Sequence, residues 1–434
     1  MTTTTISGSH GTAITLTSPT YGSPVTNTGT ISVGSGLFAL GATTAWTIVN
    51  DGKIFGSPAA GDYGVYLSSG AITNAQGATI TGGGALEIKT GAGVVLNSGL
   101  LDGAVNGGAF LYAGGYISNA NTGTIAGVSH AVGFKTGLGT LVNNGIITDT
   151  GQGDVILLAG GTVVNGATGV IRQAANSIYV NGAAGTVINS GYLYSTTAHS
   201  VELDHGGSVT NLSGGTLFGQ NAQVYSASLN SKGNSGDGPV TLTNSGFIGE
   251  TSTTSAAVAL KATINGGGTV SNLGGTIDGA GRGIVILGGL GSVYNTGLLE
   301  AGHYGVINLP GGGTVDNAIG GRILGTAATS AGIYVPGGSG YIINRGTIAE
   351  ATKSGIGLLR GGTVQDLANA TIAGGSFGLY VKGGAGTFQS IGTIIGGNGT
   401  AVALAAGYAN RVDYAVGAVF RGIVDGGNTI GAGI

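Results

Sequence analysis

Short runs of alternating apolar and polar residues, each bounded by glycine or asparagine, follow one another along most of the chain. Examples are Gly64-Val65-Tyr66-Leu67, Asp154-Val155-Ile156-Leu157-Leu158 and Gly332-Ile333-Tyr334-Val335. Runs of this length that are rich in β-branched residues and lie between turn formers predict short β-strands. No segment has the apolar stripe with a 3.6-residue period that an amphipathic helix requires. The pattern therefore predicts an all-β protein.

These runs belong to a repeat that is marked by one asparagine every 22 to 24 residues along most of the chain. The first clear copy is Val25-Thr26-Asn27-Thr28-Gly29-Thr30-Ile31. A fixed period of this size predicts one structural unit stacked many times. Asp366 and Ser390 hold the asparagine position in the last two copies, and the repeated asparagines are Asn27, Asn50, Asn74, Asn97, Asn119, Asn143, Asn165, Asn189, Asn211, Asn244, Asn272, Asn295, Asn317 and Asn344.

Two or three short strands per repeat, without the spacing of hairpins, predict one turn of a parallel β-helix. We expect a single-stranded right-handed β-helix (β-solenoid) of about 17 coils, because parallel crossovers are right-handed in nearly all cases. At about 4.8 Å per coil, the stack would be on the order of 80 Å long. Left-handed β-helices commonly use a six-residue repeat, which the chain does not show.

The repeated asparagine is predicted to form a structural ladder along the stack. A side-chain amide carries both a donor and an acceptor, so amides at one position of successive coils can bond one another. Asparagine and glycine also suit the tight turn that follows. Short turns such as Asn143-Asn144-Gly145 alternate with longer ones such as Asn165-Gly166-Ala167-Thr168-Gly169, which predicts a duplicated unit of two coils.

The repeat predicts one solenoid domain over residues 1–434, with an N-terminal edge coil at 1–24 and a closing coil at 411–434. Three spacings are longer than the others: Asn211 to Asn244, Asn244 to Asn272 and Asn317 to Asn344. The first contains a polar segment, 226–238, that we interpret as an inserted loop. Loops on a rigid scaffold often carry binding sites, but a tolerated insertion without a role explains this loop equally well.

Composition narrows the possible partners. Charged residues make up 7% of the 434-residue chain and the net charge is −3, so no basic surface for nucleic acid is expected. The chain has no cysteine, which excludes disulfides and thiolate metal sites. The N-terminal sequence is not a Sec signal peptide, and no apolar run is long enough for a transmembrane helix. The export route of an extracellular protein would thus be unknown.

Catalysis on a β-helix would require carboxylates that gather on one face of the coil. The densest group lies in His199-Ser200-Val201-Glu202-Leu203-Asp204-His205, where Glu202 and Asp204 share one side of a predicted strand. Two carboxylates beside imidazoles could hold a divalent cation. An outward face of solvated charges explains the same pattern, and the other acidic residues are scattered. We expect no catalytic residues, no cofactor and no enzymatic activity.

Sixteen tyrosines are present, and several, including Tyr66, Tyr179 and Tyr334, fall on predicted outward positions. Outward tyrosines can stack on sugar rings. The ordinary preference of tyrosine for strands explains their positions equally well.

The coil pattern Val-x-Asn-x-Gly-x-Ile, punctuated by Gly-Gly-Thr, resembles the passenger regions of bacterial autotransporter-like and haemagglutinin-like surface proteins. The resemblance covers nearly the whole chain, and the segment Gly417-Ala418-Val419-Phe420-Arg421-Gly422 looks like the element that closes such repeat blocks. It implies a β-helix at the bacterial cell surface or outside the cell. It implies no ligand.

The function that we expect is structural. An extracellular β-solenoid with open strand edges at its ends could stack head to tail with other copies and form surface or biofilm-matrix filaments. A monomeric adhesin stalk that binds a host surface or a polysaccharide is the alternative, and a polysaccharide-active enzyme is a third hypothesis. No transmembrane segment and no nucleic-acid partner is expected.

Overall fold

The computed structural model describes residues 3–151, 153–226, 238–261, 267–326 and 329–428. The chain divides into two compact units, Met1–Ser208 and Val209–Ile434, which are described separately below. Within the described residues all regular structure is β-strand or bridge. No helix long and apolar enough to cross a membrane occurs in this part of the chain. The predicted all-β class is therefore confirmed.

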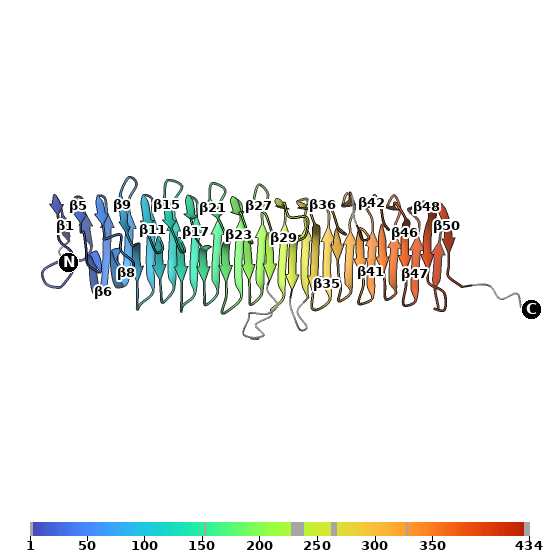
Figure 1. Cartoon of the computed structure of the whole chain (residues 1–434), viewed down its shortest axis with the longest axis horizontal. Helices are drawn as coiled ribbons and strands as arrows, with labels where there is room; N and C mark the ends of the chain where they lie inside the picture. The colour runs from blue at the N-terminus through green and yellow to red at the C-terminus, as the bar shows by residue number, and fades with distance from the viewer. Residues whose placement is uncertain (1–2, 152, 227–237, 262–266, 327–328, 429–434) are drawn as a thin grey trace, which may run out of the picture. The chain divides into compact units, whose positions relative to one another are not determined.

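In unit 1, each coil contributes one strand to each of three faces, A, B and C, and every strand pairs in parallel with the equivalent strand of the next coil (Figure 1). Two long strands, β6 (Phe38–Asn50) and β8 (Tyr63–Asn74), run from face C into face A. The other strands of face A are β1 (Thr4–Ile6), β4 (Val25–Asn27), β11 (Gly93–Asn97), β14 (Gly115–Asn119), β17 (Gly139–Asn143), β20 (Gly161–Asn165) and β23 (Gly185–Asn189).

Face B of unit 1 comprises β2 (Ser9–His10), β5 (Thr30–Ser32), β7 (Lys53–Phe55), β9 (Thr79–Gly82), β12 (Leu100–Gly103), β15 (Thr124–Gly127), β18 (Ile146–Asp149), β21 (Val170–Gln173) and β24 (Tyr192–Ser195). Face C comprises β3 (Ile14–Thr15), β10 (Gly84–Ile88), β13 (Ala109–Leu111), β16 (Val132–Phe134), β19 (Gly153–Leu157), β22 (Asn176–Val180) and β25 (Val201–Leu203). Strand β26 (Gly207–Asn211) includes the point where the two units divide.

Unit 2 repeats the arrangement. Its face A comprises β29 (Val240–Asn244), β32 (Gly268–Asn272), β35 (Gly291–Asn295), β38 (Gly313–Asn317), β41 (Gly340–Asn344), β44 (Gly362–Asp366), β47 (Gly386–Ser390) and β49 (Arg411–Tyr414). Face B comprises β27 (Thr216–Gly219), β30 (Phe247–Glu250), β33 (Thr276–Gly279), β36 (Leu298–Ala301), β39 (Arg322–Gly325), β42 (Thr347–Glu350) and β45 (Thr371–Gly374).

Face C of unit 2 comprises β28 (Val224–Ser226), β31 (Ala256–Lys261), β34 (Arg282–Leu287), β37 (Ile307–Asn308), β40 (Ile333–Val335), β43 (Ile356–Leu358) and β46 (Phe377–Val381). The last two strands, β48 (Thr393–Leu404) and β50 (Val419–Asp425), begin in face B and end in face C. Each unit is a parallel β-solenoid, and the two units have about 17 turns in all, as predicted. The right hand of the coil and the single domain stay predictions.

The interior of each unit is filled by equivalent apolar residues stacked from coil to coil. On face A of unit 1, Ile72, Val95 and Ile117 occupy one such column, and all three are fully buried. Each coil alone has too little apolar area to exclude water, so burial of these columns requires the neighbouring coils.

The asparagine ladder lies beside this apolar column and is confirmed in both units. In unit 1 each amide nitrogen donates to the amide oxygen of the next coil, for example Asn119 to Asn143 and Asn143 to Asn165, both at 2.8 Å. In unit 2 the same bonds run from Asn211 to Asn344 at 2.8 to 2.9 Å. These side chains are at most 1% exposed, so the ladder satisfies polar groups that would otherwise be costly to bury.

The turns after the ladder alternate in length. Asn143 also donates to the carbonyl of Gly145, two residues later, whereas Asn165 donates to that of Gly169, four residues later. Gly77 in a long turn has φ of +79°, and Asn369, with φ of 64°, holds the same place in the turn after Asp366. Asparagine tolerates this left-handed conformation better than other side chains do, which explains the exchange.

The predicted irregularities fall mostly beyond what the structure describes. Of the proposed loop 226–238, residues 227–237 lie outside the described residues, as do 262–266 and 327–328 in the two smaller insertions. The predicted edge coil at 1–24 contains β1, β2 and β3. The predicted closing coil at 411–434 contains β49 and β50, and its residues 429–434 are also outside the described part.

Candidate functional site

Face C of unit 1 carries two outward columns of polar and aromatic side chains. The strand register aligns Tyr66, Glu87, Phe110, Gly133, Ile156, Tyr179 and Glu202 in the first column. The second column lies two residues further along each strand or the turn after it, and contains Ser68, Lys89, Tyr112, Lys135, Leu158, Asn181 and Asp204. The side chains between the columns, such as Leu111 and Phe134, point into the core and are fully buried. Face C therefore brings together titratable residues from coils whose equivalent positions are 21 or 23 residues apart in the chain.

A cavity of about 500 Å³ opens on this face, and we call it the face C pocket. Its lining includes Tyr63, Glu87, Phe110, Tyr112, His130 and Lys135, with Asn106, Ser129, Ile156 and Leu158 around them. Gly133 lies beneath the Phe110 ring, where a Cβ atom would sit 2.2 Å from a ring carbon. Glycine at this point of the column is thus what lets the aromatic ring lie flat on the strand.

The charges of the pocket are arranged around one buried carboxylate. Glu87 is 2% exposed, and its Oε1 lies 3.0 Å from the ammonium of Lys89. Burial of Tyr63 and its hydrogen bond to Glu87 raise the pKa of the Tyr63 phenol far above its usual value, so this hydroxyl remains neutral. The ion pair leaves Lys135 as the cation whose charge is not balanced by a carboxylate among the described residues.

Tyr112 holds both lysines in place. The Nζ atom of Lys89 lies 3.6 Å from the centre of the Tyr112 ring, and that of Lys135 lies 4.5 Å from it. Lys135 also donates a hydrogen bond of 3.2 Å to the Tyr112 hydroxyl. Since cation–π contacts and hydrogen bonds restrict a flexible side chain, the Lys135 ammonium is positioned at the pocket rather than free in solvent.

The predicted pair Glu202 and Asp204 lies further along the same face. Tyr179 donates a 2.5 Å hydrogen bond to Asp204, and Asn181 donates to the Tyr179 hydroxyl at 2.7 Å. Asn176 donates to Glu202 at 2.5 Å. Burial and the neighbouring charge of Asp204 raise the pKa of Glu202 to about 7. The two carboxylates are therefore a half-buried, hydrogen-bonded pair, which differs from the solvated face that the sequence also allowed.

The histidines of this segment do not complete a metal site. The ring Nδ1 of His205 accepts a hydrogen bond from the backbone of Gly182. No group of three or more His, Cys, Asp or Glu side chains that could hold a metal ion occurs in the described parts of the chain. Glu202 and Asp204 thus come together as the sequence predicts, and the cation itself stays a hypothesis.

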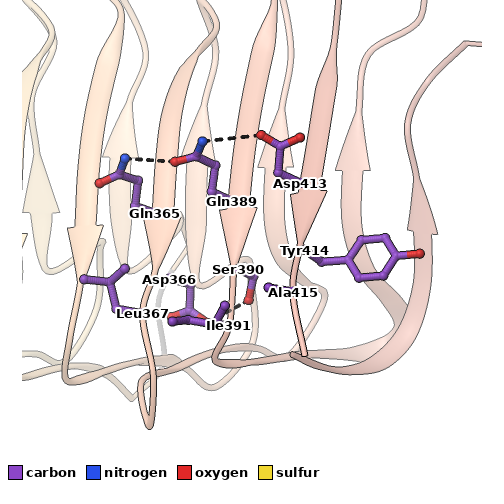
Figure 2. Close-up of a pocket in the computed structure, with 9 residues that line it drawn as sticks. All are labelled: Gln365, Asp366, Leu367, Gln389, Ser390, Ile391, Asp413, Tyr414 and Ala415. Atoms are coloured by element: carbon purple, nitrogen blue, oxygen red, sulfur yellow. Dashed lines mark hydrogen bonds between the residues drawn. The ribbon is translucent and has the colours of Figure 1, made fainter. Parts of the chain in front are cut away.

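A second cavity, of about 270 Å³, lies where the amide ladder ends in unit 2 (Figure 2). Asp366 takes the ladder position and is fully buried; it accepts hydrogen bonds from Asn344 at 2.9 Å and from the Ser390 hydroxyl at 3.3 Å. In the ladder, each amide accepts from the coil before it and donates to the coil after it. The Asp366 carboxylate accepts from both sides, so the ladder of amide donors ends at this position. Tyr414 holds the next position, and its side chain points out of the column.

Burial of Asp366 raises the pKa of its carboxyl to about 6, although its two hydrogen bonds act in the opposite direction. Above this cavity an outward chain of side chains runs from Gln365 to Gln389 at 2.9 Å and from Gln389 to Asp413 at 3.4 Å (Figure 2). The cavity marks the change from an amide ladder to an ordinary closing coil.

The sequence interpretation missed Glu87, Lys89, Tyr112 and Lys135. They come from three different coils, and none stands in a local motif. Lys89, Tyr112 and Lys135 follow one another at steps of 23 residues, and this spacing is the signal that the chain contains. Of the three tyrosines named from the sequence, Tyr66 and Tyr179 lie on this face in unit 1 and Tyr334 lies on face C of unit 2.

Comparison of the chain with protein-family models, with curated proteins and with solved structures finds no match. The repeated coils are those of a β-helix repeat protein.

Proposed function

We propose that this chain is a structural, non-enzymatic β-solenoid protein of the bacterial surface or extracellular matrix that assembles head to tail into filaments. The proposal is supported above all by the strand edges of the outermost described coils. Strands β1, β2 and β3 pair with β4, β5 and β6, and β49 and β50 pair with β47 and β48. The opposite edges of these strands face no described strand.

The two edges are complementary because the described coils pair in parallel and the inward positions of each face stay aligned across the register shifts in β6–β8 and β48–β50. In the first coil, Ile6, His10 and Ile14 pair with the column residues of the coil that follows. In the last described coil, Tyr414, Phe420 and Val424 occupy the corresponding positions of faces A, B and C. Continued stacking would therefore place Ile6 over Tyr414, His10 over Phe420 and Ile14 over Val424 of another copy.

The exposed residues of the last coil favour such a contact. Tyr414 is 73% exposed and Ile423 is 66% exposed, although both belong to strands, and Val416 in the turn between them is fully exposed. Exposed apolar side chains beside a strand edge that pairs with no described strand are typical of an association surface. A contact between two different edges of the same chain does not close on itself, so it extends into a filament. The resemblance to autotransporter-like passenger regions supports a location outside the cell.

The predicted register can be tested by disulfide trapping, because the chain has no cysteine of its own. Thr15 and Asp425 are exposed and each follows the inward residue of its face C strand. Stacked coils would bring their Cα atoms to about 4.8 Å, which suits a disulfide. We expect the double variant T15C/D425C to form a ladder of covalent oligomers under mild oxidation.

The matched control is T15C/R411C, because Arg411 is equally exposed but lies on face A. This pair should give no ladder if copies stack in the proposed register. Equal cross-linking of both pairs would indicate random collision. Head-to-tail assembly would be refuted if both double variants stayed monomeric after oxidation and microscopy of the same samples showed no filaments.

A further inference from the structure

We infer that the face C pocket of unit 1 is a binding site for an acidic oligosaccharide, a chain of pyranose units that carry carboxylates. The inference does not depend on head-to-tail assembly, because the pocket lies wholly within one unit. It rests on the length of the pocket, on the mixture of groups that line it, and on the Lys135 ammonium, which lines the pocket and forms no ion pair with a described carboxylate.

The pocket is elongated along the stack. Its lining residues come from five successive coils, from Tyr63 at the start of β8 to Leu158 just after β19. Four coil steps of about 4.8 Å give a length of roughly 19 Å. Its volume of about 500 Å³ falls within the range of ligand sites in proteins. An extended chain fits this shape better than a compact ligand does.

The lining combines apolar surface with neutral hydrogen-bonding groups. Phe110, Ile156 and Leu158 offer apolar contacts, and Leu158 is 37% exposed. Asn106 and Ser129 offer neutral donors and acceptors, and the Tyr63 hydroxyl, which donates to Glu87, offers an acceptor. A pyranose ring has an apolar C–H surface surrounded by hydroxyl groups, so it can satisfy both kinds of group at once. A purely aliphatic or aromatic ligand would leave the polar groups without partners, which is costly.

The charge of the pocket selects an anion. The Glu87 carboxylate is neutralised by Lys89 at 3.0 Å, whereas Lys135 contacts only the Tyr112 hydroxyl and aromatic rings among the described residues. A carboxylate on the ligand would give this ammonium the charge-assisted hydrogen bond that the protein does not supply. An acidic saccharide meets the shape, the polarity and the charge together.

The test uses the full chain and three probes of equal length: a hexamer of galacturonic acid, a neutral hexamer of glucose, and hexaglutamate. Binding is measured by isothermal titration calorimetry. We expect the acidic saccharide to bind at least tenfold more tightly than either of the others. Comparable binding of hexaglutamate would show that charge alone acts and would overturn the saccharide assignment, as would no binding of the acidic saccharide.

Substitutions at the pocket give effects of opposite sign, which loss of folding cannot imitate. K135Q should weaken binding of the acidic hexamer by about tenfold, because it removes a charged hydrogen bond. Leu158→Asp adds a negative charge at the pocket and should weaken binding more than K135Q does. Leu158→Lys adds a positive charge and should strengthen binding several-fold. The control K53Q removes an exposed lysine on face B and should change binding less than twofold. Equal effects of K135Q and K53Q, or the same sign for both Leu158 variants, would overturn the assignment.

Discussion

Replacing one asparagine in the middle of the ladder should destabilise the coils on either side of it, far more than replacing the asparagine next to it. Asn143 is fully buried and accepts from Asn119 and donates to Asn165, both at 2.8 Å. Asn144, the next residue, is half-buried in the turn. The pair N143A and N144A therefore compares the same substitution inside the ladder and beside it.

The size of the effect follows from the groups that lose partners. In N143A the amide oxygen of Asn165 loses its donor, whereas the Asn119 amide nitrogen keeps the carbonyls of Gly123 and Ile146. One buried acceptor without a partner costs roughly 1–3 kcal/mol, and the lost hydrogen bonds add about 1 kcal/mol each. We expect N143A to lower the local unfolding free energy by about 3 kcal/mol. N144A should change it by less than about 0.5 kcal/mol.

Hydrogen exchange measured by mass spectrometry is the suitable assay, because a repeat array opens locally and a single global transition would average over many coils. About 3 kcal/mol corresponds to roughly hundredfold faster exchange. The acceleration should appear in β14, β17 and β20 and fade within a few coils. Equal exchange in N143A and N144A would refute the idea that the ladder stabilises the stack.

Three further predictions concern single positions. D366N restores an amide at a ladder position. Because the pKa of buried Asp366 is raised from 3.8 to about 6, the parent protein loses stability as pH rises from about 4 through 6. In urea unfolding, the variant should be more stable than the parent by at most about 3 kcal/mol at pH 8 and equally stable below pH 4. G145A should be severely destabilising, because a Cβ at this position would lie 2.3 Å from two backbone oxygens. G77N should destabilise the protein less than G77A, because Asn369 already adopts the left-handed conformation of Gly77. A thermal unfolding temperature for G77N below that of G77A, or for G145A equal to that of the parent, would contradict this description of the turns. Infrared spectroscopy should show a carboxylic acid component that titrates near pH 7, separate from the component of Asp366 near pH 6, and that is lost in E202Q. A component near pH 7 that persists in E202Q would show that it does not come from Glu202.

The fold was predictable because its determinants recur in every coil. One period predicts both the apolar column, which contains Ile72, Val95 and Ile117, and the ladder through Asn119 and Asn143. A single irregular coil does not hide this period, because the other coils repeat it. The asparagine also predicted where each turn lies, because a glycine-containing turn follows it in the repeat. Local sequence and long-range stacking specify the same structure here.

The face C pocket could not be predicted in the same way. Lys89, Tyr112 and Lys135 are brought together by a column that repeats position but not residue type, so no recurring residue marks them. The neutralisation of Glu87 by Lys89, and hence the unbalanced charge of Lys135, depends on distances that only the folded coils determine. The sequence predicted that Glu202 and Asp204 lie on one side of a strand. It did not predict their hydrogen bonds to Asn176 and Tyr179, because these two residues come from the preceding coil.

In head-to-tail assembly, the coils of separate copies continue one another's stack. Electron cryomicroscopy of the purified full chain tests it most directly. We expect filaments in which the spacing of about 4.8 Å between coils continues across each junction, with Tyr414 of one copy beneath Ile6 of the next. Particles that contain one chain at every protein concentration, or filaments whose junctions join side faces instead of strand edges, would contradict it.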